Sequence, residues 1–348
     1  MSARALITGG AGFVGTNLAD RLLRGGETVV LLDDLSRPGV RSNLRWLRSH
    51  HGDRLEVVEG DVRDDVLVRA ALAGVDRAFH LAAQVAVTTS VVNPRHDFSV
   101  NLEGTLTLLE ELRRLDSPPP LLFTSTNKVY GSLDDVGLAA LDGRHQPEDP
   151  AVRSQGIGEQ RPLSFCSPYG CSKGGADQYV LDYAKSYDLR TVVFRMSCIY
   201  GPHQQGNEDQ GWVAHFFRQA MAGEPITVYG DGRQVRDVLY VDDLLDAMLL
   251  ATRSIDRISG QAFNIGGGPA STVSLLELTD LIGELSGRRP EVRFGPWRVG
   301  DQRWFVSDTR RFQRATGWSA LTGVSEGTRR LHSWLAAHDP ELFVAEVR

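Results

Sequence analysis

The stretch ALITGGAGFVGTNLADRLL (residues 5–23) places three glycines between a short apolar run and an amphipathic helical run. Gly9 allows a tight turn, Gly12 lets the backbone approach a pyrophosphate, and Gly15 lets the helix pack on the sheet. The start of such a helix offers free N–H groups and a positive partial charge to phosphates. The stretch therefore predicts a dinucleotide-binding turn, with Phe13 and Val14 inside it.

The next apolar run, TVVLLD (residues 28–33), indicates which dinucleotide binds. It ends in Asp33 and Asp34, about 20 residues after the glycines, where a carboxylate would bind the adenosine ribose. A carboxylate there repels a 2′-phosphate, which favours NAD over NADP. Arg37 is the counter-argument, because a guanidinium could reach that phosphate, but a surface arginine is the simpler interpretation.

Short apolar runs alternate with helical stretches through the first two-thirds of the 348 residues. This alternation is typical of the α/β class, a doubly wound parallel sheet (Rossmann fold) with helices on both faces. After Arg195 the pattern loosens and predicts a smaller, mixed α/β C-terminal lobe for the substrate. We expect a Rossmann domain over 1–195, to which part of 234–265 returns, and the lobe mainly over 196–348. The polar, breaker-rich segment 131–162 is predicted as a long surface loop.

Composition narrows the class of partner. The net charge of −6, with scattered lysines and arginines, argues against nucleic acid and against an anionic membrane surface. No apolar run approaches the roughly 20 residues of a membrane span. Three cysteines without metal-ligand spacing indicate a reducing compartment and no metal site. With no secretory segment at the N-terminus, the expectation is a cytoplasmic protein.

A second motif, FCSPYGCSKGGADQYV (residues 165–180), carries candidate catalytic residues. Ser167 is a plausible N-cap, so Tyr169 and Lys173, four residues apart, lie on one helix face. An ammonium near a phenol lowers the phenol pKa by about 1–3 units, which suits proton exchange with a sugar hydroxyl near neutral pH. An ordinary surface pair is the alternative, but Thr126, a hydroxyl at the end of another apolar run, favours a site.

Eight motifs in order resemble the extended short-chain dehydrogenase/reductase family, the NAD-dependent nucleotide-sugar epimerases and dehydratases, over essentially the whole chain. They are TGGAGFVG, GDVRD, HLAAQ, NLEGT, TSTNKVYG, YGCSK, IYGPHQ and GDGRQVRDVLYVDD. The resemblance implies that Thr126, Tyr169 and Lys173 are catalytic and that NAD stays bound. It also implies a homodimer through helices of the nucleotide domain, or a homotetramer.

The resemblance assigns further residues to the two ligands. For NAD they are Asp61 and Val62 at the adenine, Leu81, Ala82 and Ala83 at the pyrophosphate and ribose, Asn101, and Tyr169 with Lys173, which would hold the nicotinamide ribose. For the substrate they are Gln84, Thr126, Asn127, Cys198, Gln210, and the arginines Arg236, Arg298 and Arg303, which would clamp the diphosphate. Surface ion pairing is the alternative for the arginines. A small buried hydrophobe is the alternative for Cys198.

Asn127 and Lys128 narrow the reaction. In the family's 4,6-dehydratases an Asp-Glu pair follows the catalytic threonine and eliminates water, and the related decarboxylases keep the glutamate. An amide is no useful acid, and an ammonium is no base without losing its charge. Reversible oxidation remains: a hydride leaves the sugar and returns to its other face.

Within the family, further stretches most resemble the branch that inverts C2 of a CDP-linked deoxyhexose. They are STNKVYG, residues 167–179, RMSCIYG, EDQGW and GQAFNIGGG. Two alternatives stay open. One is a 4-epimerase of a UDP-, GDP- or dTDP-sugar, which needs the same triad. The other is a dinucleotide-sensing protein without turnover, against which the intact Thr126, Tyr169 and Lys173 argue.

Overall fold

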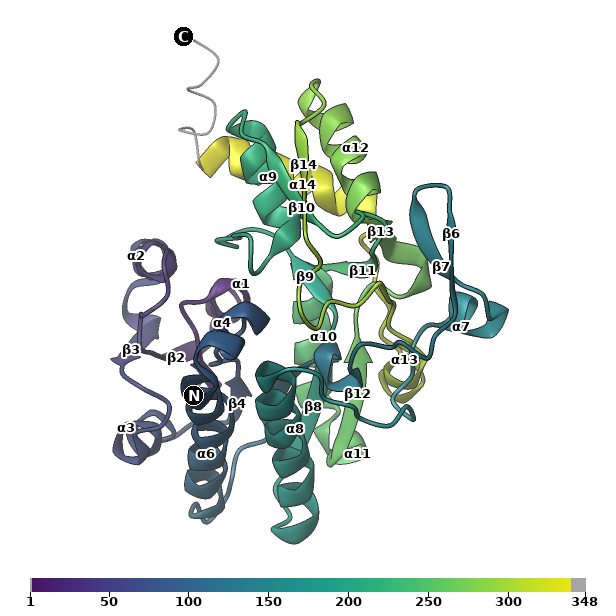
Figure 1. Cartoon of the computed structure of the whole chain (residues 1–348). Helices are drawn as coiled ribbons and strands as arrows, with labels where there is room; N and C mark the ends of the chain where they lie inside the picture. The colour runs from purple at the N-terminus through teal and green to yellow at the C-terminus, as the bar shows by residue number, and fades with distance from the viewer. Residues whose placement is uncertain (1, 339–348) are drawn as a thin grey trace.

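Seven parallel strands form the central sheet of the computed structural model, which describes residues 2–338 (Figure 1). Their spatial order is β12-β8-β5-β4-β1-β2-β3, so the chain winds outward in both directions from β1 and β4. The strands are β1 (Arg4–Thr8), β2 (Thr28–Asp33), β3 (Leu55–Glu59), β4 (Arg77–His80), β5 (Leu121–Thr126), β8 (Thr191–Met196) and β12 (Gln261–Ile265). The predicted doubly wound α/β fold is confirmed.

Helices cover both faces of this sheet, because its strands are apolar on both sides. Ala5 and Ile7 of β1 point into one core and Leu6 into the other. The first core contains α1 (Phe13–Arg24), α2 (Val40–His51), α10 (Val241–Arg253), α11 (Ile255–Ile258) and α13 (Arg310–Thr316). The second contains α3 (Asp65–Ala71), α6 (Gly104–Arg113) and α8 (Pro168–Ser186). Shorter helices α4 (Val87–Val92), α5 (Pro94–Phe98) and the π-helical η2 (Ser99–Glu103) precede α6.

The C-terminal part adds a smaller, mixed lobe with its own core around Phe217, Ile226, Leu278 and Leu331. Its elements are β9 (Cys198–Tyr200), α9 (Trp212–Met221), β10 (Ile226–Tyr229), β11 (Val235–Tyr240), β13 (Thr272–Ser274), α12 (Leu275–Ser286), β14 (Val292–Gly295), β15 (Trp304–Phe305) and α14 (Val324–His338). The expected domain boundary at residue 195 stays a prediction. The strand β12, which lies within residues 234–265, pairs with β8 in the central sheet.

The prediction of a long surface loop over 131–162 is wrong. The segment contains the hairpin β6 (Leu138–Leu141) and β7 (Arg144–Pro147), followed by α7 (Pro150–Gln155). Asp142 and Gly143 both have positive φ, which is the backbone that a two-residue hairpin turn requires. The Asp-Gly pair is therefore the local signal, and the polar composition around it concealed the hairpin.

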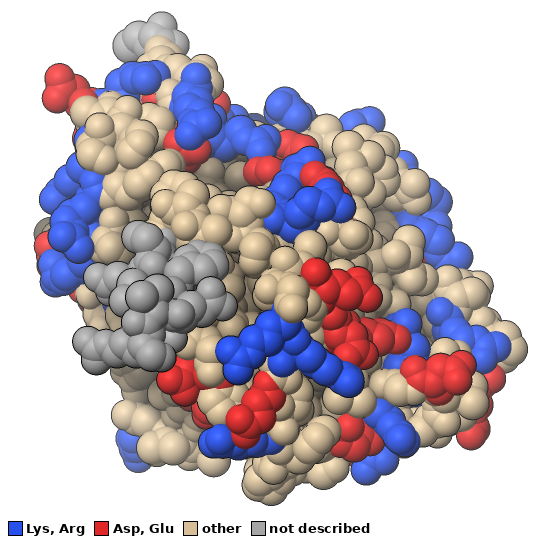
Figure 2. All heavy atoms as spheres, turned by 90° about the horizontal axis from the view of Figure 1, so that it is seen from above, with Lys and Arg blue, Asp and Glu red and all other residues tan. Residues whose placement is uncertain are grey.

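Charges are mixed over the face seen from above, where basic and acidic side chains lie beside one another (Figure 2). Ion pairs on the lobe include Arg329 with Glu326 and Arg289 with Asp280. Over residues 2–338, no helix has the length and apolar character needed to cross a bilayer.

Candidate active site

A cavity of about 550 Å³ lies where the carboxyl ends of the central strands face the lobe. Nineteen of the predicted site residues line it: Gly9, Gly12, Phe13, Val14, Gly15, Asp33, Asp34, Asp61, Val62, Leu81, Ala82, Ala83, Gln84, Thr126, Asn127, Tyr169, Lys173, Cys198 and Gln210. Asn101, Arg236, Arg298 and Arg303 are outside this lining.

The glycine turn forms one end of the cavity, and its three glycines differ in what surrounds them. A Cβ on Gly9 would lie 2.7 Å from the Ala82 nitrogen, and one on Gly15 would lie 2.5 Å from the Gly9 oxygen. Both glycines therefore serve close backbone packing, and Gly9 also has a φ of +67°. A Cβ on Gly12 would meet only the Gly9 oxygen, at 3.2 Å, and would otherwise occupy cavity space. This cradle fits a pyrophosphate at the start of α1.

Asp33 is held in place beside this turn by two backbone groups. Its carboxylate accepts hydrogen bonds from the nitrogens of Ala11 and Leu35, each at 2.9 Å. Burial raises the pKa of Asp33, and these two hydrogen bonds oppose the shift. Asp34 and Asp61 line the same end, so the residues present fit NAD rather than a dinucleotide with an extra phosphate.

Arg37 is more than the surface arginine that the sequence suggested. It is exposed, but it also lines the cavity and donates a hydrogen bond to Gln210 of the lobe. The pair therefore spans from the segment after β2 to the segment before α9.

Tyr169, Lys173 and Thr126 meet in the cavity. The predicted N-cap is present, since the Ser167 hydroxyl accepts a hydrogen bond from the Gly170 nitrogen at 3.1 Å. Tyr169 and Lys173 are both buried on α8, and the Lys173 Nζ lies 4.2 Å from the ring centroid of Phe123. Thr126 is buried at the end of β5. The structure thus brings three chemically competent groups together.

The expected net lowering of the Tyr169 pKa is not found in this structure. Burial raises the pKa of Tyr169 to about 12, while a hydrogen bond with Thr126 and the charge of Arg37 oppose the rise. Burial also lowers the pKa of Lys173 to about 7, against the charges of Asp177 and Asp97. Desolvation dominates both groups because both are almost fully removed from water.

Asn101 lies behind the cavity wall and holds two of its elements. Its Oδ1 accepts from the Gln84 nitrogen at 2.8 Å, and its Nδ2 donates to the Ser172 hydroxyl at 3.0 Å and to Asp97 at 3.2 Å. The π-helical segment η2 places Asn101 there. Its predicted role in cofactor binding stays a prediction.

Sequence reasoning missed Asp97 and Ser172. Asp97 is buried and accepts a hydrogen bond from the Ser172 hydroxyl at 2.5 Å. The available signal was the position of Ser172, directly before Lys173 in the chain. Nothing in the sequence pairs it with a carboxylate 75 residues earlier.

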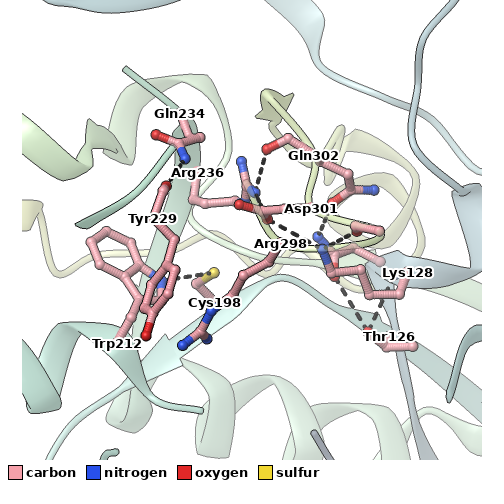
Figure 3. A network of polar contacts seen from close by, with 12 residues as sticks. Thr126, Lys128, Cys198, Trp212, Tyr229, Gln234, Arg236, Arg298, Asp301 and Gln302 are labelled. Atoms are coloured by element: carbon pink, nitrogen blue, oxygen red, sulfur yellow. Dashed lines mark hydrogen bonds and ion pairs between the residues drawn. The ribbon is translucent and has the colours of Figure 1, made fainter. Parts of the chain in front are cut away.

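Asn127 and Lys128 begin the short helix η3 (Asn127–Tyr130) after β5, and only Asn127 lines the cavity. The Lys128 Nζ points to the lobe, where it donates to the Gly300 oxygen at 3.1 Å and lies 3.7 Å from the Asp301 carboxylate (Figure 3). Burial lowers the pKa of Lys128, and Asp301 opposes the shift. A side chain at position 128 is therefore directed to the lobe.

The three predicted arginines are placed differently from one another. Arg236 is buried on β11 and donates to the Asp301 carboxylate at 2.7 Å. Arg298 stacks its guanidinium 3.7 Å from the ring centroid of Tyr229 and donates to the Glu208 oxygen. Arg303 is exposed over the Trp297 ring, outside the cavity lining. A role for any of them in binding a diphosphate stays a prediction.

Cys198 lines the lobe side of the cavity beside Trp212, whose Nε1 donates to the thiol sulfur at 3.4 Å. Burial raises the pKa of the Cys198 thiol. It is therefore a small uncharged group in the wall rather than a thiolate nucleophile.

Comparison with known proteins agrees with this arrangement. The sequence profile of the NAD dependent epimerase/dehydratase family matches residues 5–266. The chain is 41% identical to the CDP-paratose 2-epimerase of Salmonella typhi, over 96% of this chain and 99% of that protein. It is 34% identical to a UDP-glucose 4-epimerase of Mycolicibacterium smegmatis, over 93% and 96% of the two chains.

Solved structures agree as well. The UDP-glucose 4-epimerase of Thermus thermophilus in complex with NAD superposes with a TM-score of 0.81 at 31% identity, covering 96% of this chain and 99% of that one. A dTDP-glucose 4,6-dehydratase of Streptomyces venezuelae with NAD bound has a TM-score of 0.83 at 28% identity, covering 97% and 98%.

Proposed function

The chain belongs to the NAD-dependent epimerase/dehydratase family and uses NAD, and on this basis we propose that it inverts C2 of a CDP-linked deoxyhexose of the paratose type. The observation that carries the choice is the 41% identity to a CDP-paratose 2-epimerase over almost the full length of both chains. The matched UDP-glucose 4-epimerase is less similar, at 34%.

The side chains after β5 support epimerisation over dehydration. Elimination of water needs an acid and a base at the sugar, and Asn127 offers only an amide to the cavity. Lys128 is directed to Gly300 and Asp301. Among the described lining residues the carboxylates are Asp33, Asp34, Asp61 and Asp209, of which the first three lie at the dinucleotide end.

Residues within the first 101 positions, together with Tyr169 and Lys173, would hold the cofactor. The backbone around Gly12 suits the pyrophosphate, Asp33 suits the adenosine ribose, and Asp61 with Val62 suits the adenine edge. When bound, NAD supplies a hydride acceptor that can later return the hydride to the same carbon.

Tyr169 would exchange the proton of the sugar hydroxyl at its phenol oxygen, and the Thr126 hydroxyl would hold that sugar oxygen in place. Each transfer to the phenolate leaves a neutral phenol, which the buried site favours. Lys173 would offset the phenolate charge from one helical turn away, because residues four apart share a helix face. Burial of both groups limits proton exchange with water.

A panel of substrates tests the proposal. Purified protein without added cofactor is incubated in deuterated water with CDP-, UDP-, GDP- and dTDP-sugars, and products are assigned by NMR. We expect inversion at C2 of the CDP-deoxyhexose without solvent deuterium at that carbon. Inversion at C4 of a UDP-, GDP- or dTDP-sugar would replace the proposal with a 4-epimerase. Deuterium at the inverted carbon would indicate proton abstraction from carbon instead of hydride transfer.

A further inference from the structure

Two segments that are far apart in sequence are joined beside the cavity, behind Thr126 and Asn127. One is η3, directly after the strand that carries Thr126, and the other is the stretch 300–302 before β15 (Figure 3). Lys128 donates to the Gly300 oxygen at 3.1 Å, and Asn127 donates to the Gln302 side chain at 3.2 Å. The Gln302 amide donates in turn to the Gly131 oxygen at 2.7 Å.

Charge joins the same two segments. The Asp301 carboxylate lies 3.7 Å from the Lys128 ammonium and accepts a hydrogen bond from Arg236 at 2.7 Å. All three side chains are at most about a quarter exposed, with 18% for Lys128, 26% for Asp301 and 8% for Arg236. The Asp301 carboxylate is therefore the shared counter-ion of the Lys128 ammonium and the Arg236 guanidinium, both of which are largely removed from water. Loss of the carboxylate would leave the two cations facing each other with no anion between them.

The contacts between η3 and residues 300–302 also involve the threonine proposed as catalytic, Thr126. The Lys128 backbone nitrogen donates to the Thr126 hydroxyl at 3.2 Å, and that hydroxyl can donate to the Asn127 side-chain oxygen at 3.3 Å. The position of η3 thus fixes the direction in which the Thr126 hydroxyl points. A change at the Lys128 side chain can reach the reacting groups without touching the cavity.

We propose that Lys128 and Asp301 form a positioning clamp, which fixes η3 to the lobe and so orients the Thr126 hydroxyl toward Tyr169. Lys128 is a positioning residue, since its ammonium contacts the lobe and not the cavity. The clamp requires a cationic side chain at position 128, because a carboxylate there would be repelled by the Asp301 carboxylate. The inference rests on the proposed function for its kinetic test and is independent of it for its folding test.

The clamp has a predictable effect on the proton chemistry. The groups that act on the Tyr169 pKa are Thr126 on β5, Asp97 on α5 and Arg37 after β2, and Lys173 lies four residues further along the same helix. Of these, Thr126 is a neutral hydrogen-bond partner that lowers the Tyr169 pKa. A loosened clamp weakens that hydrogen bond, so the acid side of the pH–rate profile moves to higher pH.

A double-mutant cycle on the holoenzyme tests the clamp, with Lys128→Met, Asp301→Asn, the double variant and Lys128→Arg. We expect each single change to lower kcat by about tenfold with KM little changed, and the double variant to be no worse than either. Lys128→Arg should keep most of the activity, because it keeps the cation. In Lys128→Met the acid side of the profile should move up by about half a pH unit.

The matched control is Arg144→Met, which removes an ion pair to Glu277 and a hydrogen bond to Thr272 away from the cavity. It should leave the pH profile unchanged. Additive effects of Lys128→Met and Asp301→Asn, or a wild-type profile in Lys128→Met, would overturn the clamp. If Lys128→Met does not fold, Lys128→Arg and Asp301→Asn decide, and a kcat for Asp301→Asn equal to wild type overturns it.

The two proposals fail separately. A wild-type protein that epimerises another nucleotide sugar contradicts the proposed function, and the cycle is then run with that sugar. Without any turnover, the urea midpoints of the wild type, Lys128→Met, Asp301→Asn and the double variant still measure coupling between Lys128 and Asp301. Coupled midpoints support the clamp, and additive midpoints overturn it.

Discussion

The two ends of the cavity differ in whether backbone or side chains form them. At the dinucleotide end the backbone forms the binding surface, with Gly9 and Gly15 packed against neighbouring main chain and Gly12 open to the cavity. At the other end, Thr126 and Asn127 line the cavity, and behind them contacts among residues 127, 128, 236 and 300–302 join segments far apart in the sequence. A glycine turn is a local property of the chain. A side-chain network exists only once the lobe has folded onto the sheet.

This difference explains how the two ends can change separately in function. The dinucleotide end carries chemistry that any hydride-transferring relative needs, and it depends on a few backbone positions. We expect the side chains at the other end to decide which carbon reacts and whether water is lost. The following experiments separate the two ends, beginning with the change that should cost the most.

Tyr169→Phe should lower kcat by about a thousandfold, because it removes the only phenol oxygen assigned to the proton transfer. The variant should keep its NAD, since the dinucleotide end is untouched. Steady-state rates and the NAD content of the purified protein are the measurements. A variant with wild-type kcat would remove Tyr169 from the mechanism.

Gly15→Ala and Gly12→Ala should separate packing from binding within the dinucleotide end. A methyl group on Gly15 meets the Gly9 oxygen at 2.5 Å, so we expect a loss of about 1–3 kcal/mol in the free energy of unfolding. Gly12→Ala should fold almost normally and weaken NAD binding by about tenfold. Urea unfolding and calorimetric titration with NAD measure the two effects. Equal loss of stability in both would contradict the assignment.

Asn127→Asp with Lys128→Glu places a family-type acidic pair after Thr126 and tests the end of the cavity that Thr126 and Asn127 line. We expect no dehydrated product, because position 128 faces Gly300 and Asp301 rather than the cavity. Epimerisation should fall by about ten- to a hundredfold through repulsion from Asp301. Epimerisation is measured with the CDP-deoxyhexose, and dehydration with CDP-glucose, which keeps the C6 hydroxyl that elimination removes; mass spectrometry of the products distinguishes these outcomes. A loss of about 18 mass units, the mass of one water, would show that the pair alone determines dehydration.

The smallest effect concerns a contact between the nucleotide domain and the lobe. The His203 ring lies 4.3 Å from the Trp46 ring and 5.0 Å from the Trp334 ring, measured between centroids. Burial lowers the His203 pKa to about 4, below the 6.5 of the unfolded chain. The unfolded state therefore binds more protons between these values, and stability falls as pH falls from 6.5 toward 4.

His203→Phe keeps an aromatic ring without this proton. It should lose about 1–3 kcal/mol less than wild type over that pH range, as measured by urea unfolding at several pH values. His203→Gln serves as the comparison without a ring. Parallel pH curves for His203→Phe and wild type would show that His203 does not report on this contact.

Much of the fold could be predicted from the sequence, because its signals are local. The glycine turn, the acid after β2, and the alternation of apolar runs with helices each lie within about 30 residues. The hairpin at residues 138–147 was missed although its Asp142-Gly143 turn is equally local. There the surrounding polar residues outweighed a two-residue signal.

The candidate site could be predicted only in part. Residues that face the cavity from strand ends and from the start of α8 were found, since motifs mark them. The partners behind them were not found. Asp97 under Ser172 depends on a contact across 75 residues, and Asp301 beside Lys128 on a longer one, for which a single sequence has no signal. The Tyr169 pKa shift was also misjudged, because burial is a property of the folded chain.

One measurement tests the central claim, which is that hydrogen leaves and returns to the same carbon inside the cavity. CDP-paratose carrying deuterium at C2 is mixed with an equal amount of undeuterated, carbon-13-marked substrate and converted in ordinary water. We expect every product molecule to keep its own C2 hydrogen isotope. Exchange of the deuterium with water, or its transfer to the carbon-13-marked molecules, would contradict a hydride that returns to the same sugar molecule within one turnover.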